Sequence, residues 1–452
     1  MRTVVILRKP FAVAQDRLRH GRFSQAVERF LTEPALSAAN VFRMTLLLTV
    51  TPLILEAQAS PSIRIGAHGV FLYTHADPVP RNRGLGEIRL VQPAVMVHAG
   101  AFANRLRFIG TLDLEGVTIP NGELTPGAWG EGFIDRRHPH TYIHELMLTG
   151  EQVLGEASGG VRVSLSLGKG FAPFGTDDPM SRPIIRYPVN HHLAQILERA
   201  VVIAGVSAGP VILEGGLFNG DEPETPGDWP RLSRMGDSWS GRVTLIPLRN
   251  LEVQSSYASV HSPEHRLGSG TDQQKWSVSA RWEAPVSGVP LFGLVEWART
   301  SEAEGFFVFH SLLAEGAWTR GRSRLHYRFE RTERPEEERT LNPFRSVRPH
   351  FENSIHGTTR WTIHTLGYSL RLSVPKVRIA GAPFAEISYG RMARVGGGLF
   401  DIRPFYGRTS FWSFGAGIRL SVGMPVHRMG RYGVAQDTAK LADADHHMSH
   451  AE

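Results

Sequence analysis

The sequence predicts an all-β fold, a membrane-spanning antiparallel barrel of about sixteen strands, and two observations support this prediction. From about residue 60 onward, short segments alternate between apolar and polar residues. The connections between these segments alternate between tight turns and long loops. Lipid offers no partners to backbone N–H and C=O groups, so a sheet that crosses a membrane has to close on itself. The alternation then supplies one face for lipid and one for a wet lumen.

The alternation is clearest in residues 276–283. There Trp276, Val278, Ala280 and Trp282 would share one face of a strand, with polar residues on the other. Fifteen further segments can be marked in the same way. The expected strands are residues 62–74, 89–101, 105–115, 139–150, 161–170, 197–206, 210–218, 239–248, 251–261, 273–285, 290–300, 306–319, 323–333, 358–373, 377–393 and 410–423.

The connections support a barrel over a soluble sandwich or propeller, which gives no reason for alternating lengths. Outer-membrane barrels have short periplasmic turns and long outer loops. The expected long loops are residues 75–88, 116–138, 171–196, 219–238, 334–357 and 394–409. The expected short turns are residues 102–104, 207–209, 249–250, 320–322 and 374–376, and the connection 151–160 is an exception.

Two strands depart from the pattern. Segment 358–373 changes phase after Thr365, which predicts a bulge. Segment 377–393 contains Pro383, and proline is unusual in a sheet without an edge.

Aromatic residues gather near the expected strand ends, where a membrane barrel carries girdles at the two interfaces. Strands are also rich in aromatic residues for reasons of packing, which is the plainer explanation. The candidate girdle residues are Trp239, Trp276, Trp282, Trp318, Trp361, Tyr389 and Trp412.

The N-terminal region has the pattern of a secretory signal. Arg43 precedes a largely apolar stretch, Met44 to Leu55, and an A-x-A site follows at residues 57–59. We expect a signal peptide at 44–59, preceded by an over-extended start or an N-terminal extension at 1–43. The barrel is expected at 60–423. Residues 424–452 lose the alternation and are expected to form a polar, disordered periplasmic tail whose histidines could bind a metal loosely.

Composition narrows the class of protein. Hydrophobic residues make up 41% of the chain, and no apolar run is long enough for a membrane-spanning helix. There is no cysteine, which excludes disulfides and thiolate sites. Of the net charge of +7, residues 1–59 contribute +4, so the barrel is nearly balanced and gives no reason to expect nucleic acid as a partner.

The predicted register turns a set of charged side chains inward. Such charges are tolerated in a wet lumen, whereas Lys or Arg at the lipid-facing midplane costs about 2–4 kcal/mol. A barrel of sixteen strands is wide enough to leave an aqueous channel. The pore-lining candidates are Arg107, Arg162, Arg242, Arg281, Glu283, Arg328 and Glu330.

The third long loop, 171–196, mixes acids, bases and histidines with prolines. A loop folded into a barrel narrows it and sets charge selectivity, although a solvated surface loop would fit the sequence equally well. The constriction candidates are Asp177, Asp178, Arg182, Arg186, His191 and His192.

Two motifs resemble a known family. Residues 163–175, which end in Phe171-Ala172-Pro173-Phe174-Gly175, are similar to a segment of the phosphate-selective porins and related bacterial porins, and residues 215–220 resemble a strand of that family that ends in Phe-Asn-Gly. The resemblance implies a sixteen-stranded outer-membrane channel, commonly trimeric. The basic ladder that gives phosphate selectivity is not recognisable here, and the chain does not end in the family's terminal aromatic residue.

Other functions are less well supported. Residues 205–209 match G-x-S-x-G, but that motif needs a strand-to-helix elbow, and here it joins two strands as a hairpin turn. His138, His140 and His144 lie with Glu145 at the start of an expected strand, where a hydrolase could use a rim histidine. His138 and His140 share a face by period and could hold a metal, but such a pair is more often solvated. A barrel plugged by large inward residues such as Phe292 and Leu294 would be a structural or binding protein.

The sequence therefore predicts no catalytic residues, no resident metal and no cofactor. We expect an outer-membrane channel for passive diffusion of small hydrophilic solutes or ions, in contact with outer-membrane lipid, with a homotrimer as the implied assembly.

Overall fold

The computed structural model describes residues 61–79, 83–118, 140–155, 160–223, 225–263, 265, 267–286, 289–337, 355–374, 378–424 and 427–439. They belong to one compact unit, Pro52–Glu452. The expected extension and signal peptide at 1–59, His138, and the end of the tail at 440–452 lie outside these residues.

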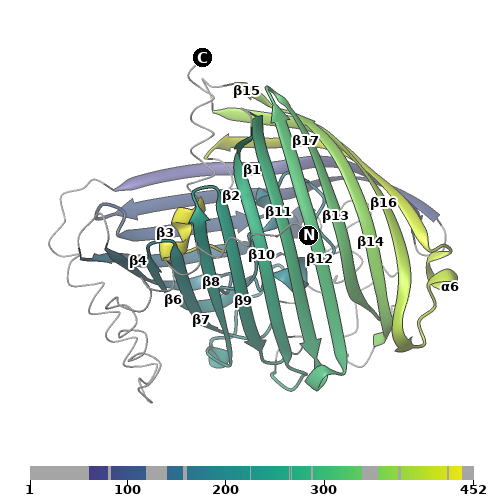
Figure 1. Cartoon of the computed structure of the whole chain (residues 1–452), viewed down its shortest axis with the longest axis horizontal. Coiled ribbons are helices and arrows are strands. Elements are labelled where there is room, and N and C mark those ends of the chain that lie inside the picture. The colour runs from purple at the N-terminus through teal and green to yellow at the C-terminus, as the bar shows by residue number, and fades with distance from the viewer. Residues whose placement is uncertain are drawn as a thin grey trace, which may run out of the picture. The chain divides into compact units, whose positions relative to one another are not determined.

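All sixteen expected strands are confirmed (Figure 1). β14 and the three-residue β15 are one strand interrupted at Arg371, because both pair with β16. The strands are β1 (Ser62–Val79), β2 (Arg83–Ala101), β3 (Leu106–Asp113), β4 (Ile143–Leu154), β5 (Val161–Gly170), β6 (Arg199–Ala208), β7 (Val211–Phe218), β8 (Ser238–Leu248), β9 (Leu251–Val260), β10 (Gln273–Val286), β11 (Val289–Glu302), β12 (Phe307–Arg320), β13 (Ser323–Glu337), β14 (Ile355–Leu370), β15 (Leu372–Val374), β16 (Ile379–Gly398) and β17 (Ser410–Gly423).

Each strand pairs antiparallel with its neighbours in sequence, and β1 closes the ring by pairing with both β2 and β17. The closing ladder runs from Gly66 opposite Gly423 to Asp77 opposite Trp412. Closure removes the sheet edges, so the backbone polar groups of the strands are satisfied within the wall.

The connections are mostly as expected, with tight turns at one end and long loops at the other. Gly209, with φ +57°, and Pro210 form the turn between β6 and β7, which confirms the hairpin interpretation of residues 205–209. One expected loop is wrong: most of residues 75–88 extends β1 and β2, which pair as far as Val79 opposite Arg83.

Short helical turns occupy some loops. They are α4 (Glu115–Thr118), η3 (Pro179–Ser181), α5 (His191–Ala194), η4 (Leu232–Arg234), η5 (Ala303–Gly305), α6 (Ile402–Tyr406) and η8 (Gly433–Ala439). Within the described ranges, no helix is both long enough and apolar enough to span a membrane.

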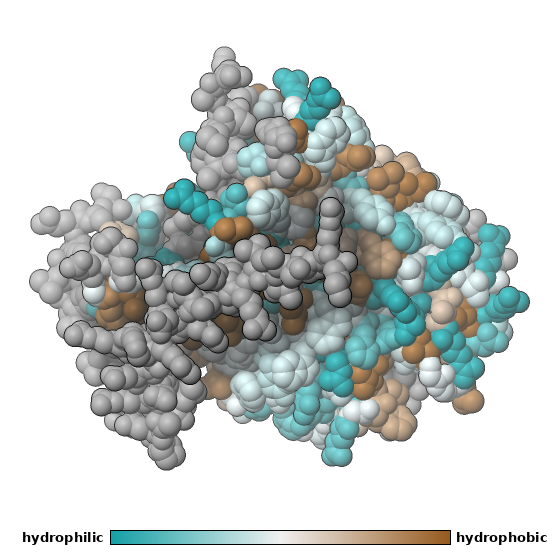
Figure 2. Space-filling model, in the orientation of Figure 1, coloured by the Kyte–Doolittle hydropathy of each residue, from teal (hydrophilic) through white to brown (hydrophobic). Residues whose placement is uncertain are grey.

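The outer face of the wall is apolar, and Figure 2 shows several hydrophobic patches on it. Exposed aliphatic side chains project outward from most of the strands. They include Leu148, Leu167, Val206, Leu213, Leu217, Val243, Leu245, Val278, Val295, Leu312, Leu325, Leu366 and Ile387. An apolar belt around a closed antiparallel barrel is the construction of outer-membrane proteins, and it places this chain in such a membrane.

The phase change in β14 has a different cause from the expected bulge. Residues 359–370 pair with β13 without a register shift, so the bulge at Thr365 is wrong. Instead Trp361 and Ile363 point inward and are buried, and the Trp361 ring packs 5.4 Å from that of Phe411. The shift near Gly69 lies between β1 and β2, where Gln92 has a φ of 52°.

Pro383 lies where the ladder is already broken. It pairs with Ile418 of β17, while on its other side β14 ends and β15 begins around Arg371. The missing N–H therefore falls beside an interruption of the neighbouring strand.

The aromatic side chains form clusters on the outer wall near the loop end. Trp239, Tyr257 and Trp276 are in ring contact across β8, β9 and β10, and Tyr389 contacts Trp412. Trp318 is also exposed, and Trp282 is half-buried. Trp361 does not belong to the girdle, because it faces the interior with 1% of its surface exposed.

Candidate functional site

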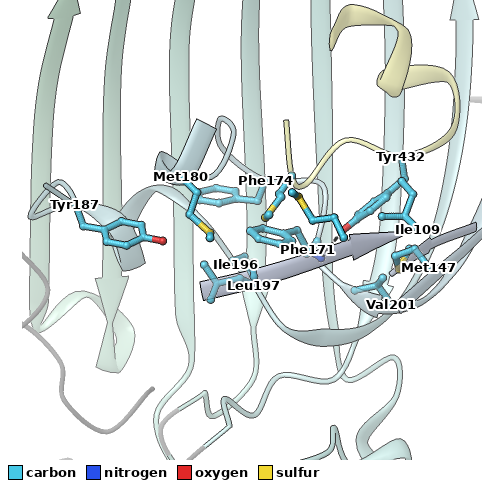
Figure 3. Packing of buried hydrophobic residues seen from close by; sticks show 14 of the residues in the cluster. Ile109, Met147, Phe171, Phe174, Met180, Tyr187, Ile196, Leu197, Val201 and Tyr432 are labelled. Carbon is cyan, nitrogen blue, oxygen red and sulfur yellow. Dashed lines mark hydrogen bonds between the residues drawn. The ribbon is translucent and has the colours of Figure 1, made fainter. Parts of the chain in front are cut away.

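The loop 171–198, between β5 and β6, runs through the interior of the barrel. Nearly all of its described side chains are buried. Phe171, Phe174, Met180 and Tyr187 pack in one apolar cluster with inward side chains of the wall (Figure 3). Its wall and terminal members include Ile109, Met147, Val201, Met429 and Tyr432. The surface-loop alternative is therefore wrong.

The two motifs that resemble porins meet where this loop leaves the wall. A Cβ on Gly216 of β7 would lie 2.6 Å from the Pro173 ring, so the loop packs directly on the β7 backbone. Gly175 has φ +66°, and a Cβ there would lie 1.6 Å from the Ala194 carbonyl. Its N–H donates to Ser256 Oγ at 2.9 Å. Only glycine fits this close crossing of the two ends of the loop.

Carboxylates of the opposite wall hold the far side of the loop. Glu330 accepts hydrogen bonds from Arg186 and from the Val189 N–H, both at 2.7 Å. Glu386 accepts from the Ile185 N–H at 2.7 Å. Glu296 accepts from Asn190 at 2.7 Å. The loop thus spans the lumen from β5 to β11, β13 and β16.

A second segment also lies inside the barrel. Residues 427–439, here called the terminal segment, follow β17 and end in η8, which contacts β4, β5, β6 and β7. In Figure 1 this yellow stretch lies within the ring of strands. Met429, Tyr432, Val434 and Ala435 are fully or almost fully buried.

Asp177 joins the loop to the terminal segment. Its carboxylate accepts hydrogen bonds from Arg428 Nε and Nη2 at 2.7 and 2.6 Å and pairs with Arg281 of β10. Burial alone would raise the pKa of Asp177, but the two guanidinium groups outweigh it and hold that pKa well below its ordinary value. Burial also lowers the pKa of Arg431 to about 10, helped by Arg242, whereas the two carboxylates beside Arg428 outweigh burial there and raise its pKa.

The wall contributes further contacts to the terminal segment. Glu252 of β9 accepts from Arg428 at 3.0 Å and from Arg431 at 2.8 Å. Tyr432 donates its hydroxyl to Glu145 at 2.7 Å and accepts from the Phe171 N–H at 3.2 Å. Burial and the Glu145 carboxylate together raise the pKa of Tyr432 well above its ordinary value, so it stays a neutral donor.

The pore-lining candidates all lie on the inner face, but each is engaged by another group. Arg242 donates to Glu214 at 2.6 and 2.8 Å and to the Gly430 carbonyl at 3.0 Å. Arg328 donates to Glu315 at 2.6 Å and to the Arg186 carbonyl. Most of them thus anchor the loop or the terminal segment. The remaining members and partners are Arg107 with Glu151 and the Gly433 carbonyl, Arg162 with Glu151 and the Val434 carbonyl, Arg281 with Asp177 and Glu283, and Glu330 with Arg186.

Of the constriction candidates, Asp177, Asp178, Arg182, Arg186 and His191 are buried. Asp178 caps η3 by accepting from the Met180 N–H at 2.7 Å. The Arg182 guanidinium lies 3.6 Å from both Glu296 and Glu315. The His192 side chain lies outside the described part of the chain.

Sequence reasoning missed the terminal segment. The expectation that disorder begins at residue 424 is wrong for residues 427–439. Composition gave no signal, because residues 427–439 and 440–452 each contain five hydrophobic residues in thirteen. Gly430 and Gly433 have φ values of +84° and +56°, so the backbone bends in ways that strand periodicity does not predict.

A small cavity, with room for about one water molecule, remains beside the loop. Arg186 lies on the loop side of this cavity, and β1, β16 and β17 form the opposite wall. The wall residues are Leu72, Thr74, Glu386, Ser388, Ser413 and Gly415. Five of its seven lining residues are polar, and two of these, Arg186 and Glu386, carry opposite charges.

The fold and the interior together define an outer-membrane β-barrel. Similar solved structures include the anion-selective porin from Comamonas acidovorans (11% identity, 81% of this chain, 100% of that chain, TM-score 0.46). They also include OmpT with loop L8 deleted, an outer membrane protein of Vibrio cholerae (12%, 80%, 100%, 0.46), and OccK10 of Pseudomonas aeruginosa (10%, 81%, 99%, 0.39).

No family model matches the chain. No curated protein matches it either. The likeness to phosphate-selective porins therefore stays a resemblance carried by residues 163–175 and 215–220.

Proposed function

We propose that this protein is an outer-membrane channel for passive diffusion of small hydrophilic solutes or ions. One observation carries the proposal: the inner face of a membrane barrel is lined by charges and crossed by a loop that leaves a small gap beside polar side chains of the wall. Buried ion pairs add little net stability to a barrel, because each pair has to recover its own desolvation, so stability alone does not account for so many of them.

The proposed passage runs between the loop and the wall formed by β1, β16 and β17. Arg186 and Glu386 face it together with hydroxyl groups of Thr74, Ser388 and Ser413. Hydroxyl groups and charges of both signs can replace water around a small polar solute without strong selection for one sign of charge. This favours weak ion selectivity over a dedicated phosphate path.

The terminal segment sets how much of the lumen is open. It fills the side of the barrel near β4 to β7, whereas the cavity lies near β1, β16 and β17. We infer that the channel conducts weakly with the segment docked and strongly when it leaves. Assembly as a homotrimer is a further part of the proposal, and the native mass in detergent tests it.

The test is the single-channel conductance of the protein in a planar lipid bilayer. We expect small, salt-dependent steps, and a reversal potential close to zero in a salt gradient. Barrels that insert without any current, under all voltages and after loss of the terminal segment, would favour the closed structural barrel. Lipid and peptide hydrolysis would then be assayed.

A further inference from the structure

A cluster of histidines and carboxylates lies at the outer ends of β3 and β4, away from the proposed passage. Asp113 is the last residue of β3, and His140 and His144 flank the start of β4. Their exposed fractions are 1%, 7% and 0%. One candidate ligand atom from each lies within 4.8 Å of the other two. We propose that these three side chains bind a divalent transition-metal ion of the zinc class.

Glu198 has the position of a supporting carboxylate. It precedes β6, at the foot of the lumen loop, and its Oε1 is 2.6 Å from His144 Nδ1 and 3.2 Å from His140 Nδ1. Metal-binding histidines commonly give one ring N–H to such a carboxylate, which fixes the tautomer and leaves the other nitrogen for the metal. Glu198 is itself held, because it accepts from the Thr141 N–H at 3.1 and 3.0 Å.

Two potential metal-binding atoms of the cluster make no hydrogen bond. His144 Nε2 and Asp113 Oδ2 are buried without a hydrogen-bond partner, although the other polar atom of each group is satisfied. Leaving a buried polar atom unpaired is costly, so such atoms call for an explanation. Two imidazoles and one carboxylate form a ligand set that zinc-class ions accept.

The surroundings favour a cation at this point. The carboxylates of Glu115 and Glu198 add to that of Asp113. Lys169 and Arg199 are nearby cations. The Lys169 ammonium donates to the Thr141 hydroxyl and lies above the Trp229 ring, and Arg199 is paired with Glu222. The His191 ring centroid lies 5.9 Å from that of His140, so a third imidazole borders the site.

A metal here would join three parts of the barrel. Asp113 belongs to β3, the histidines to the start of β4, and their partner Glu198 to the foot of the loop. The ion would fix that foot against the outer rim, on the side of the lumen opposite the anchors Glu330 and Glu386. The site does not depend on the proposed channel function.

The test is zinc uptake by the full chain, purified in detergent, stripped with a chelator and dialysed against zinc. His446, His447 and His450 are replaced by alanine to remove the tail as a second source of imidazole. We expect one zinc per chain. His144→Gln and Asp113→Asn should abolish uptake, and Glu198→Gln should weaken affinity by roughly 10–100-fold.

The matched control is His326→Gln. His326 is also buried and also faces a carboxylate, Glu386 at 3.3 Å, but it lies in β13 outside the cluster. The His326→Gln variant should take up one zinc per chain, as the parent does. No uptake by the parent, unchanged uptake by His144→Gln, or equal loss in His326→Gln would overturn the proposal.

Because a buried substitution can prevent folding, a second measurement uses the parent alone. X-ray absorption at the zinc edge should show two imidazole ligands with oxygen completing the shell. A shell of water oxygens without imidazole would overturn the proposal whatever the variants do.

Discussion

Two chain segments share the lumen, and they are held in different ways. The loop 171–198 is tied to the wall at both ends and contributes Phe171, Phe174, Met180 and Tyr187 to the apolar cluster. The terminal segment 427–439 follows β17 and, within the described residues, does not lead into another strand of the wall. Apart from Met429, Tyr432 and a few apolar residues around η8, its contacts are charged, chiefly those of Arg428 and Arg431.

This difference in contacts indicates which of the two segments can leave the lumen. Release of the loop would break the apolar cluster. It would also leave Glu330 and Glu386 without the hydrogen bonds that they accept from the loop. Release of the terminal segment exposes less apolar surface and returns charged groups to water, which recovers much of their desolvation. We therefore expect the loop to be a fixed constriction and the terminal segment a removable one.

The largest expected effect follows from removing the segment. A chain that ends at Met424 keeps β17 and its ladder to β1 but loses the plug. We expect its single-channel conductance to rise several-fold. The variant should retain the sheet content and heat-resistant gel mobility of the parent, and an unchanged conductance in such a folded barrel would remove the distinction between the two segments.

Loss of the two arginines should act in the same direction with a smaller effect. The double variant Arg428→Ala with Arg431→Ala removes both arginines that pair with Glu252. Asp177 loses Arg428 and keeps its ion pair with Arg281. Breaking buried pairs in this way costs roughly 3–5 kcal/mol. We expect frequent openings to the level of the truncated chain. The exposed Arg391→Ala at the loop end is the control, and it should conduct as the parent does.

Acid should weaken the same contact. The pKa of Asp177 lies below its ordinary value of 3.8 in the docked state, so its contribution to docking is complete above that value and is lost as pH falls below it. We expect conductance to rise between about pH 4 and pH 2. Asp177→Asn should show raised conductance at neutral pH and a smaller further rise with acid, because Glu252 still bonds Arg428 and Arg431. An unchanged parental pH profile in this variant would show that Asp177 is not responsible.

The smallest effect on conductance is expected in the loop. Glu330→Gln removes the charge opposite Arg186 but leaves an oxygen for the Val189 N–H. Thermal unfolding should reveal a loss of roughly 1–3 kcal/mol, while conductance changes by less than in any variant of the terminal segment. A large increase in conductance would mean that the loop, too, is removable.

The strands were predictable because membrane and lumen impose alternation on each of them. Trp276 to Glu283 carries that pattern within one segment. The pattern misled at Trp361, because the interior here is packed with apolar side chains as well as charges. Inward arginines such as Arg242 and Arg328 were found by register, yet register says nothing of their partners.

The partners come from segments without periodicity. Arg428 and Arg431 meet Asp177 across some 250 residues of sequence, and no local pattern links them. The same holds for Glu198 beside His140 and His144, where two loops and a strand end converge. Ion pairs between residues far apart in the sequence form only once the wall has closed, and strand periodicity does not say which inward side chains then meet.

Whether the terminal segment occupies the lumen is tested most directly by the reactivity of a single cysteine at Val434, which is fully buried in that segment. The chain has no cysteine of its own, so a membrane-impermeant thiol reagent reports on this position alone. We predict that Val434→Cys reacts much more slowly than Asn104→Cys in an exposed turn, and that Arg428→Ala with Arg431→Ala removes this protection. Equal rates at both positions in the intact protein would show that the terminal segment does not occupy the lumen.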